Sequence, residues 1–172
     1  MQQHINPAAL PGEGKAALYI RQATPTQTVM GSDLGQLPTQ RLITFAHEKG
    51  FTDENLVVFN DSGLPATAAL EKREGMRELI SAIEHDAVKA VFIRSEYSLY
   101  RDARLADMLF FVLLCQQHNV VVITPDMVYD FSNVLHGKLF QFRLEGASFV
   151  LSAKALRNRT RQQLGQQKRG NQ

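Results

Sequence analysis

The chain has 172 residues, of which 44% are hydrophobic, and its 19 Lys and Arg against 17 Asp and Glu give a formal net charge of +2. A chain of this length can bury one proper core, and it contains no apolar run long enough to cross a bilayer, so its composition favours one soluble globular domain over a membrane protein. The single cysteine, Cys115, excludes an internal disulfide and lies in the apolar run "MLFFVLLCQQ", where we expect it to fill the core.

The N-terminal segment, residues 1–14, has no basic region followed by an apolar stretch. It therefore predicts a flexible lead rather than a secretory signal, and we expect a cytoplasmic protein. After this lead we expect an α/β domain over residues 15–131, a long helix over residues 132–165 and a basic tail over residues 166–172.

Four short segments are almost continuously apolar, as is typical of strands buried on both faces of a parallel sheet: 15–21, 55–61, 89–95 and 119–125. Helical patterns lie between them, over residues 39–50, 74–86 and 102–119. This alternation predicts right-handed crossovers and a three-layer, open, mostly parallel α/β sheet. In such sheets ligands bind beyond the carboxyl ends of the strands, so the segments that follow the strands are the place to look for a site.

The chain from Ser132 to Leu164 contains no proline. A single helix of that length would run roughly 45–50 Å. Two apolar stripes lie along it: Leu135, Leu139, Phe142, Phe149 and Leu156 form the first, and Phe140, Leu144, Ala147, Leu151 and Ala155 form the second. One sheet cannot easily cover both stripes, so we expect the second to pack on another subunit. The alternative is a break at Gly146 that gives two ordinary helices.

No acidic residue follows Glu145, whereas six basic residues do: Lys154, Arg157, Arg159, Arg161, Lys168 and Arg169. The rest of the chain then holds 13 Lys and Arg against 17 Asp and Glu and is mildly acidic. A basic end on an acidic body suggests contact with a polyanion, most simply nucleic acid. A solvated helix end that suits the helix dipole is the alternative reading.

Three separated arginines lie in segments that follow predicted strands: Arg21, Arg73 and Arg101. Together they could converge at one end of the sheet and clamp a phosphate diester. The alternative is that each is an ordinary surface arginine. The chain has no glycine-rich phosphate loop, and its five histidines are scattered without the spacing of metal ligands, so we expect neither a cofactor nor a catalytic metal.

The order of these features resembles the catalytic domain of serine recombinases, the resolvase and invertase family, over about residues 16–168. The resemblance rests on "YIRQATPTQ", "DSG", "REGMRELISAI", "KAVFIRSEYSLYRD" and "NVVVIT", and on "LFQFRLEGASFVLSAKALRNRT" near the end. The closing segment is more similar to the large serine recombinases and transposon recombinases than to the shortest resolvases.

In that family the first strand ends in Y-x-R-x-S-T-x-x-Q, and the serine hydroxyl attacks a DNA phosphodiester to form a covalent phosphoserine linkage. Residues Tyr19, Arg21, Thr24 and Gln27 stand at matching positions, but Ala23 stands at the position of the serine. The resemblance thus places the frame of a DNA-cutting site here without its nucleophile.

The second family motif, D-R-L-x-R, supplies an acid and two arginines that bind the scissile phosphate. Here Tyr97 and Ser98 replace the acid and the first arginine, while Leu99 and Arg101 remain. Arg73 matches a further family arginine that precedes the helix after the second strand. Because an alanine side chain has no lone pair, the covalent route is lost rather than slowed.

The resemblance therefore implies a degenerate domain with no intact catalytic residue, which acts by dimerisation and by binding DNA, an active recombinase or both, in site-specific recombination or its regulation. We expect a homodimer or higher oligomer through the long C-terminal helix, and DNA binding that is weak and non-specific for the chain alone. The predicted phosphate and DNA contacts are Arg21, Gln27, Arg73, Arg101, Arg157, Arg159, Arg161 and Lys168.

Two other functions stay open at this stage. The domain could still cut DNA, through Thr24 or Ser98 as a substitute nucleophile or with a serine supplied by a partner subunit. It could also be an α/β protein-interaction module unrelated to DNA.

Overall fold

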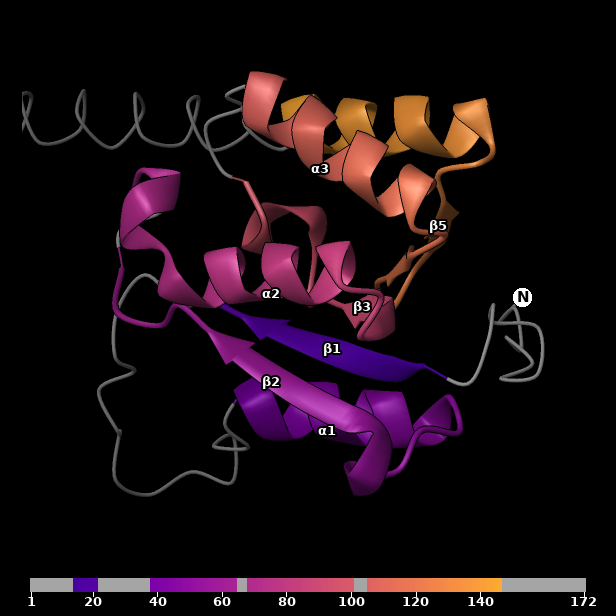
Figure 1. Ribbon diagram of the computed structural model, residues 1–172. Coiled ribbons are helices and arrows are strands. Elements are labelled where there is room, and N and C mark those ends of the chain that lie inside the picture. Colours follow the sequence, from indigo (N-terminus) through magenta and orange to yellow (C-terminus); the bar gives the residue numbers. More distant parts are fainter. Residues whose placement is uncertain (1–13, 22–37, 65–67, 101–104, 147–172) are drawn as a thin grey trace, which may run out of the picture.

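The computed structural model describes residues 14–21, 38–64, 68–100 and 105–146 (Figure 1). Its strands are β1 (Lys15–Ile20), β2 (Leu56–Asn60), β3 (Val88–Phe92), β4 (Val121–Ile123) and β5 (Val128–Asp130). Its α-helices are α1 (Pro38–Glu48), α2 (Glu74–Glu84), α3 (Leu105–Gln117) and a further helix over residues 134–146. Short 3-10 helices are η2 (Asp53–Asn55), η3 (Leu70–Lys72) and η4 (Glu96–Ser98).

The five strands form one sheet in the order β2-β1-β3-β4-β5. The first four strands are parallel to one another, and β5 pairs antiparallel with β4. Helices cover both faces: α1 lies on one side, and α2, α3 and the helix over residues 134–146 lie on the other (Figure 1). The predicted three-layer, mostly parallel α/β sheet is confirmed.

Alternate residues of the central strands point to opposite faces of this sheet. On β1, Ala17 and Tyr19 join the larger core beneath α2 and α3, whereas Leu18 and Ile20 join the core beneath α1. Both sets are buried, which explains why the strands are apolar without alternation. Cys115 is fully buried in the larger core, as expected.

The three helices that return the chain to the sheet end in the same way. Gly50, Asp86 and Asn119 have positive φ angles of 93°, 55° and 54°. In each case the next residue's N–H donates to a carbonyl five residues back, for example Phe51 to Ala46 at 3.1 Å. This pattern is a Schellman motif, and the predicted helix end at Gly50 is part of it.

The strand β5 was not predicted from the sequence. It follows a tight turn closed by the Thr124 N–H, which donates to the Met127 carbonyl at 2.8 Å. Proline and aspartate at positions 125 and 126 favour such a turn, so "TPDM" between two apolar segments was the available signal. Only three residues follow it in the strand, too few for a clear period-2 pattern.

In the described residues, the two apolar stripes of the C-terminal helix do not have the expected roles, and Leu139 of the first stripe packs partly buried against the larger core. Phe140 and Leu144, from the second stripe, are buried against the chain's own core, where Phe140 meets the rings of Tyr129 and Phe131 at 5.0 and 5.4 Å. Phe142, from the first stripe, is 70% exposed. The expectation that the second stripe faces another subunit is therefore wrong for these residues, because β5 and the segment after it form an aromatic pocket for it.

The helix is described only as far as residue 146, so its predicted continuation to residue 165 and the alternative of a break at Gly146 lie outside the described residues. Within the described ranges, no helix is long and apolar enough to cross a membrane.

Candidate functional site

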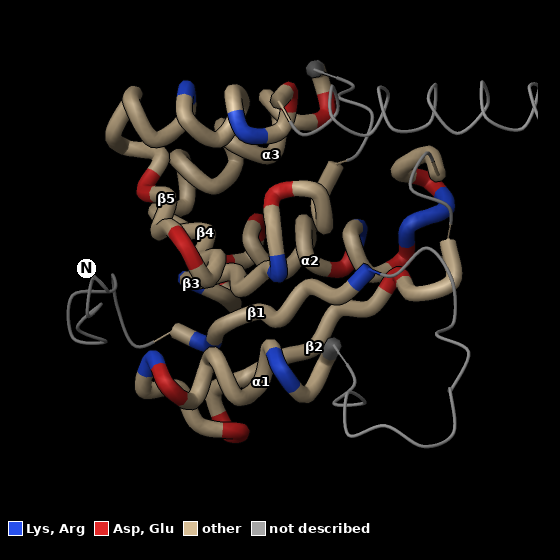
Figure 2. Tube along the Cα trace, turned by 180° about the vertical axis from the view of Figure 1, so that it is seen from behind, with Lys and Arg blue, Asp and Glu red and all other residues tan. Residues whose placement is uncertain are grey.

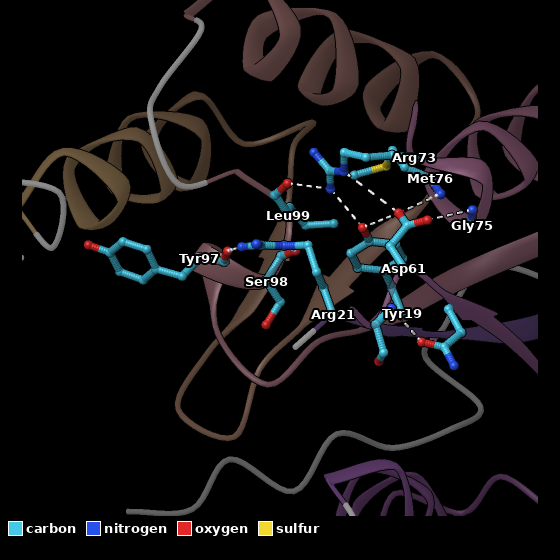
Figure 3. Close-up of polar contacts among 11 residues, drawn as sticks. Tyr19, Arg21, Asp61, Arg73, Gly75, Met76, Tyr97, Ser98 and Leu99 are labelled. Carbon is cyan, nitrogen blue, oxygen red and sulfur yellow. Dashed lines mark hydrogen bonds and ion pairs between the residues drawn. The ribbon is translucent and has the colours of Figure 1, made fainter. Parts of the chain in front are cut away.

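Tyr19, Asp61 and Arg73 form a buried polar network beyond the carboxyl ends of β1 and β2 (Figure 3). The Tyr19 hydroxyl donates to Asp61 Oδ2 at 2.6 Å and accepts from Arg73 Nη2 at 2.7 Å. Arg73 Nε lies 3.6 Å from the same carboxylate oxygen. Burial raises the pKa of Tyr19 well above its usual range, with Arg73 opposing the rise, so the hydroxyl stays protonated and keeps donating to Asp61.

The Asp61 carboxylate also holds the first turn of α2. Its Oδ1 accepts the Gly75 N–H at 2.7 Å, and its Oδ2 accepts the Met76 N–H at 3.0 Å. A carboxylate at a helix N-terminus satisfies N–H groups that have no partner within the helix and faces the positive end of its dipole. Asp61 therefore fixes α2 against β2 and at the same time balances the charge of Arg73.

Arg73 is built into the protein interior. Its second Nη2 hydrogen bond goes to the Leu99 carbonyl at 2.6 Å, and its guanidinium carbon lies 5.8 and 5.6 Å from the ring centroids of Tyr19 and Tyr100. The side chain is 6% exposed. A buried guanidinium needs such partners, and here an internal carboxylate, a hydroxyl and a carbonyl supply them.

Arg21 follows β1 and reaches the turn after β3. Its Nε donates to the Ser98 carbonyl at 2.9 Å, and its Nη2 donates to the Tyr97 carbonyl at 2.5 Å. Carbonyls of three consecutive residues, Tyr97, Ser98 and Leu99, thus accept hydrogen bonds from two arginines (Figure 3). The structure brings Arg21 and Arg73 to one short segment, at the edge of the sheet where the sequence predicts a site.

Glu96, at the start of η4, was not singled out from the sequence. It is 7% exposed, and its Oε1 accepts a hydrogen bond from the Tyr129 hydroxyl of β5 and lies 3.4 Å from Arg143 Nη1 on the helix over residues 134–146. Burial, and then the hydrogen bond to Glu96, raise the pKa of Tyr129 and keep it a donor. A glutamate in the segment after the apolar third strand was the only sequence signal for this contact.

Tyr97 and Ser98, at the positions of the family's acid and first arginine, both lie in η4, and Ser98 is 5% exposed. The other predicted site residues lie outside the described residues: Ala23, Thr24, Gln27, Arg101, Arg157, Arg159, Arg161 and Lys168. Acidic and basic residues are interspersed over the described elements (Figure 2). Among those same elements, no group of three or more His, Cys, Asp or Glu side chains is arranged to hold a metal ion.

A family model described as "Resolvase, N terminal domain" matches residues 16–172. The chain therefore belongs to the resolvase family. Its fold is that of a serine recombinase catalytic domain, which places the chain among serine-recombinase-like domains of site-specific recombination.

Solved structures of such domains resemble this one. The N-terminal catalytic domain of TP901-1 integrase has a TM-score of 0.55 and 23% sequence identity, with 81% of this chain and 98% of that chain covered. A resolvase family site-specific recombinase from Streptococcus pneumoniae has a TM-score of 0.47 and 19% identity, covering 93% of this chain and 100% of that one. The similarity to the integrase domain supports the fold, whereas the TM-score of the second structure is too low to support any argument. A comparison with curated proteins gives no significant match.

Proposed function

We propose that this chain is a degenerate serine recombinase domain that works by association rather than by cutting DNA. It pairs with a second copy or with an active recombinase, binds the DNA backbone without reading its sequence, and acts in site-specific recombination or its regulation. The frame of β1, Arg21 and Arg73 is retained, whereas alanine stands where the family has its nucleophile.

The observation that carries this proposal is the burial of Ser98. The family motif has a phosphate-binding arginine at this position, but here the residue is a serine that is 5% exposed in the 3-10 turn η4. Little of Ser98 is exposed, so a longer arginine side chain there should disturb the turn. This supports a loss of the phosphate-binding chemistry that goes beyond the missing nucleophile at Ala23.

Its surroundings also argue against Ser98 as a substitute nucleophile, because among the described residues no hydrogen bond joins its hydroxyl to a base that could take its proton. Thr24 remains as the candidate for the competing enzyme function. The family motif has a threonine at this position beside its serine, so Thr24 matches a residue that is not the family's nucleophile.

The test is a search for a covalent protein–DNA adduct on a denaturing gel. We expect the natural chain to form no adduct with duplex DNA, alone or mixed with an active serine recombinase whose own adduct serves as the positive control. An adduct formed by the natural chain and abolished by Thr24→Ala would contradict the proposal.

A second arm restores the family residues. The variant Ala23→Ser, Tyr97→Asp, Ser98→Arg is compared with Ala23→Ser, Tyr97→Asp, which leaves Ser98 in place. We expect Ser98→Arg to lower the melting temperature because it forces a long side chain into a closed turn. Cleavage by the triple variant would show that the frame is a recombinase that lost its reaction.

A further inference from the structure

The turn η4 and the residue after it lie against Arg21 and Arg73, the two described arginines of the predicted phosphate site (the arginine site). In the family motif this segment contributes an acid and an arginine. Here the η4 carbonyls of Tyr97 and Ser98 accept hydrogen bonds from Arg21, and the carbonyl of the next residue, Leu99, accepts one from Arg73. The Nε and Nη2 groups of Arg21, which could form a bidentate clamp on a phosphate, point at the carbonyls of Ser98 and Tyr97. An anion that took the Nε and Nη2 face of Arg21 would have to displace both carbonyl oxygens.

The same turn is tied to the C-terminal helix by its first side chain. Glu96 pairs with Arg143 at 3.4 Å and accepts from Tyr129, and neither contact involves Arg21 or Arg73. The Arg143 side chain is 37% exposed and can reach water by itself, but the Glu96 side chain is 10% exposed and depends on these donors. If the donors were removed, the carboxylate would gain by turning toward solvent, and the Tyr97 and Ser98 carbonyls would move with it.

From these contacts we infer that η4 acts as an internal plug: its carbonyls occupy the Arg21 donors that would otherwise bind a phosphate. The helix over residues 134–146 keeps η4 in this position through Glu96. The ligand class that competes with the plug is a phosphate group. The inference rests on the phosphate-binding role proposed for Arg21. It adds a form of regulation, in which shifts of the C-terminal helix against η4 open or close that site.

The experiment follows the Arg21 Nε–H signal of the full chain by NMR, with inorganic phosphate as the probe and chloride used to hold the ionic strength constant. The signal is assigned as the one that disappears in Arg21→Lys. Two variants weaken the ion pair between η4 and the helix, Glu96→Gln and Arg143→Met. The control is Arg77→Met, which removes an exposed arginine from α2.

We expect the natural chain and Arg77→Met to show an Arg21 signal that phosphate barely shifts. In Glu96→Gln and Arg143→Met the half-saturating phosphate concentration should fall about tenfold, as expected when a charge-assisted hydrogen bond is removed. Amide exchange in β1 and β3 should stay unchanged, which separates opening of the plug from general loss of structure. If Arg143→Met does not fold, Glu96→Gln carries the test, because its amide still accepts from Tyr129.

An equal response to phosphate in all four proteins would overturn the inference, and so would no response in any of them. Neither result would touch the proposed function, whose own failure is a covalent adduct formed by the natural chain. The two proposals can therefore fail separately.

Discussion

At the residue scale, the Asp61 carboxylate has three structural roles at once. It accepts from Tyr19, caps α2 through Gly75 and Met76, and balances Arg73. Such a network holds its shape only while every member is present, because each buried group that loses its partner is left unsatisfied. This explains how the interior of the site stays ordered although alanine stands at the nucleophile position.

Gly75 is the position where this network tolerates no side chain. A Cβ there would lie 2.7 Å from the Asn60 backbone nitrogen and 2.9 Å from its carbonyl carbon. We expect Gly75→Ala to lower the free energy of unfolding by about 1–3 kcal/mol, since backbone atoms of β2 must move. Chemical denaturation measures the effect.

The matched control is Gly137→Ala, in the helix over residues 134–146. Its added Cβ would meet only Val112 Cγ1, at an ordinary 4.0 Å. This change should raise stability by about 0.5–1 kcal/mol, because alanine loses less conformational entropy in a helix. Equal effects of the two substitutions would contradict the tight contact between α2 and β2.

At the element scale, α3 and the helix over residues 134–146 each present large apolar side chains to solvent. Leu109, Phe110 and Leu113 on α3, and Val134, Leu135 and Phe142 on the other helix, are 44–70% exposed. The sequence of α3 is apolar nearly all round, which is typical of a helix covered on more than one side. These two faces support the proposed self-association, to which the sequence had assigned the C-terminal helix alone.

A truncation that ends the chain before residue 132 is a poor test of that association. It would also remove Phe140 and Leu144, which belong to the core. Surface substitutions are sharper. We expect Leu113→Gln with Phe142→Gln to weaken self-association at least about tenfold, given the roughly 1.5–3 kcal/mol of burial for each large apolar side chain. Analytical ultracentrifugation measures this, and Val58→Gln, at an exposed position of the edge strand β2, is the control. An unchanged oligomer in the double variant would refute a role of these faces.

At the scale of the whole molecule, the charge distribution separates the proposed DNA contact from the folded body. The described elements carry interspersed charges (Figure 2), whereas six basic residues and no acid follow Glu145 in the sequence. Binding through those residues should depend strongly on salt, because each neutralised phosphate releases a counterion.

We therefore expect Arg157→Gln, Arg159→Gln, Arg161→Gln to weaken binding to any duplex sequence alike. The slope of log K against log salt is negative, and its magnitude should fall by about 2.7, at about 0.9 for each phosphate that the variant no longer neutralises. Fluorescence anisotropy with two unrelated duplexes measures both effects. A variant that keeps the natural salt slope would assign the DNA contact to other residues, whereas a natural chain that binds no DNA would favour an interaction module unrelated to DNA.

Much of this fold was predictable because local patterns determine it. Continuous apolar segments predicted β1 to β4, and apolar residues at helical spacing predicted α1, α2 and α3. Gly50 and Asn119 predicted two of the helix ends. The short strand β5 was missed because three residues carry too little periodicity. The second stripe of the C-terminal helix was wrongly assigned to another subunit because a stripe alone does not reveal which surface covers it.

The sequence by itself determined the kind of sheet, the family resemblance and the alanine at the nucleophile position, since these depend on residue types and their order along the chain. Only the tertiary structure decided that Arg73 is enclosed by Tyr19, Asp61 and Leu99, and that Arg21 meets the carbonyls of η4. The physical reason is that main-chain carbonyls carry no signature in a sequence. Whether an arginine faces a ligand or its own backbone depends on how distant segments pack together, as the separations of 26 residues between Arg73 and Leu99 and 77 residues between Arg21 and Ser98 illustrate.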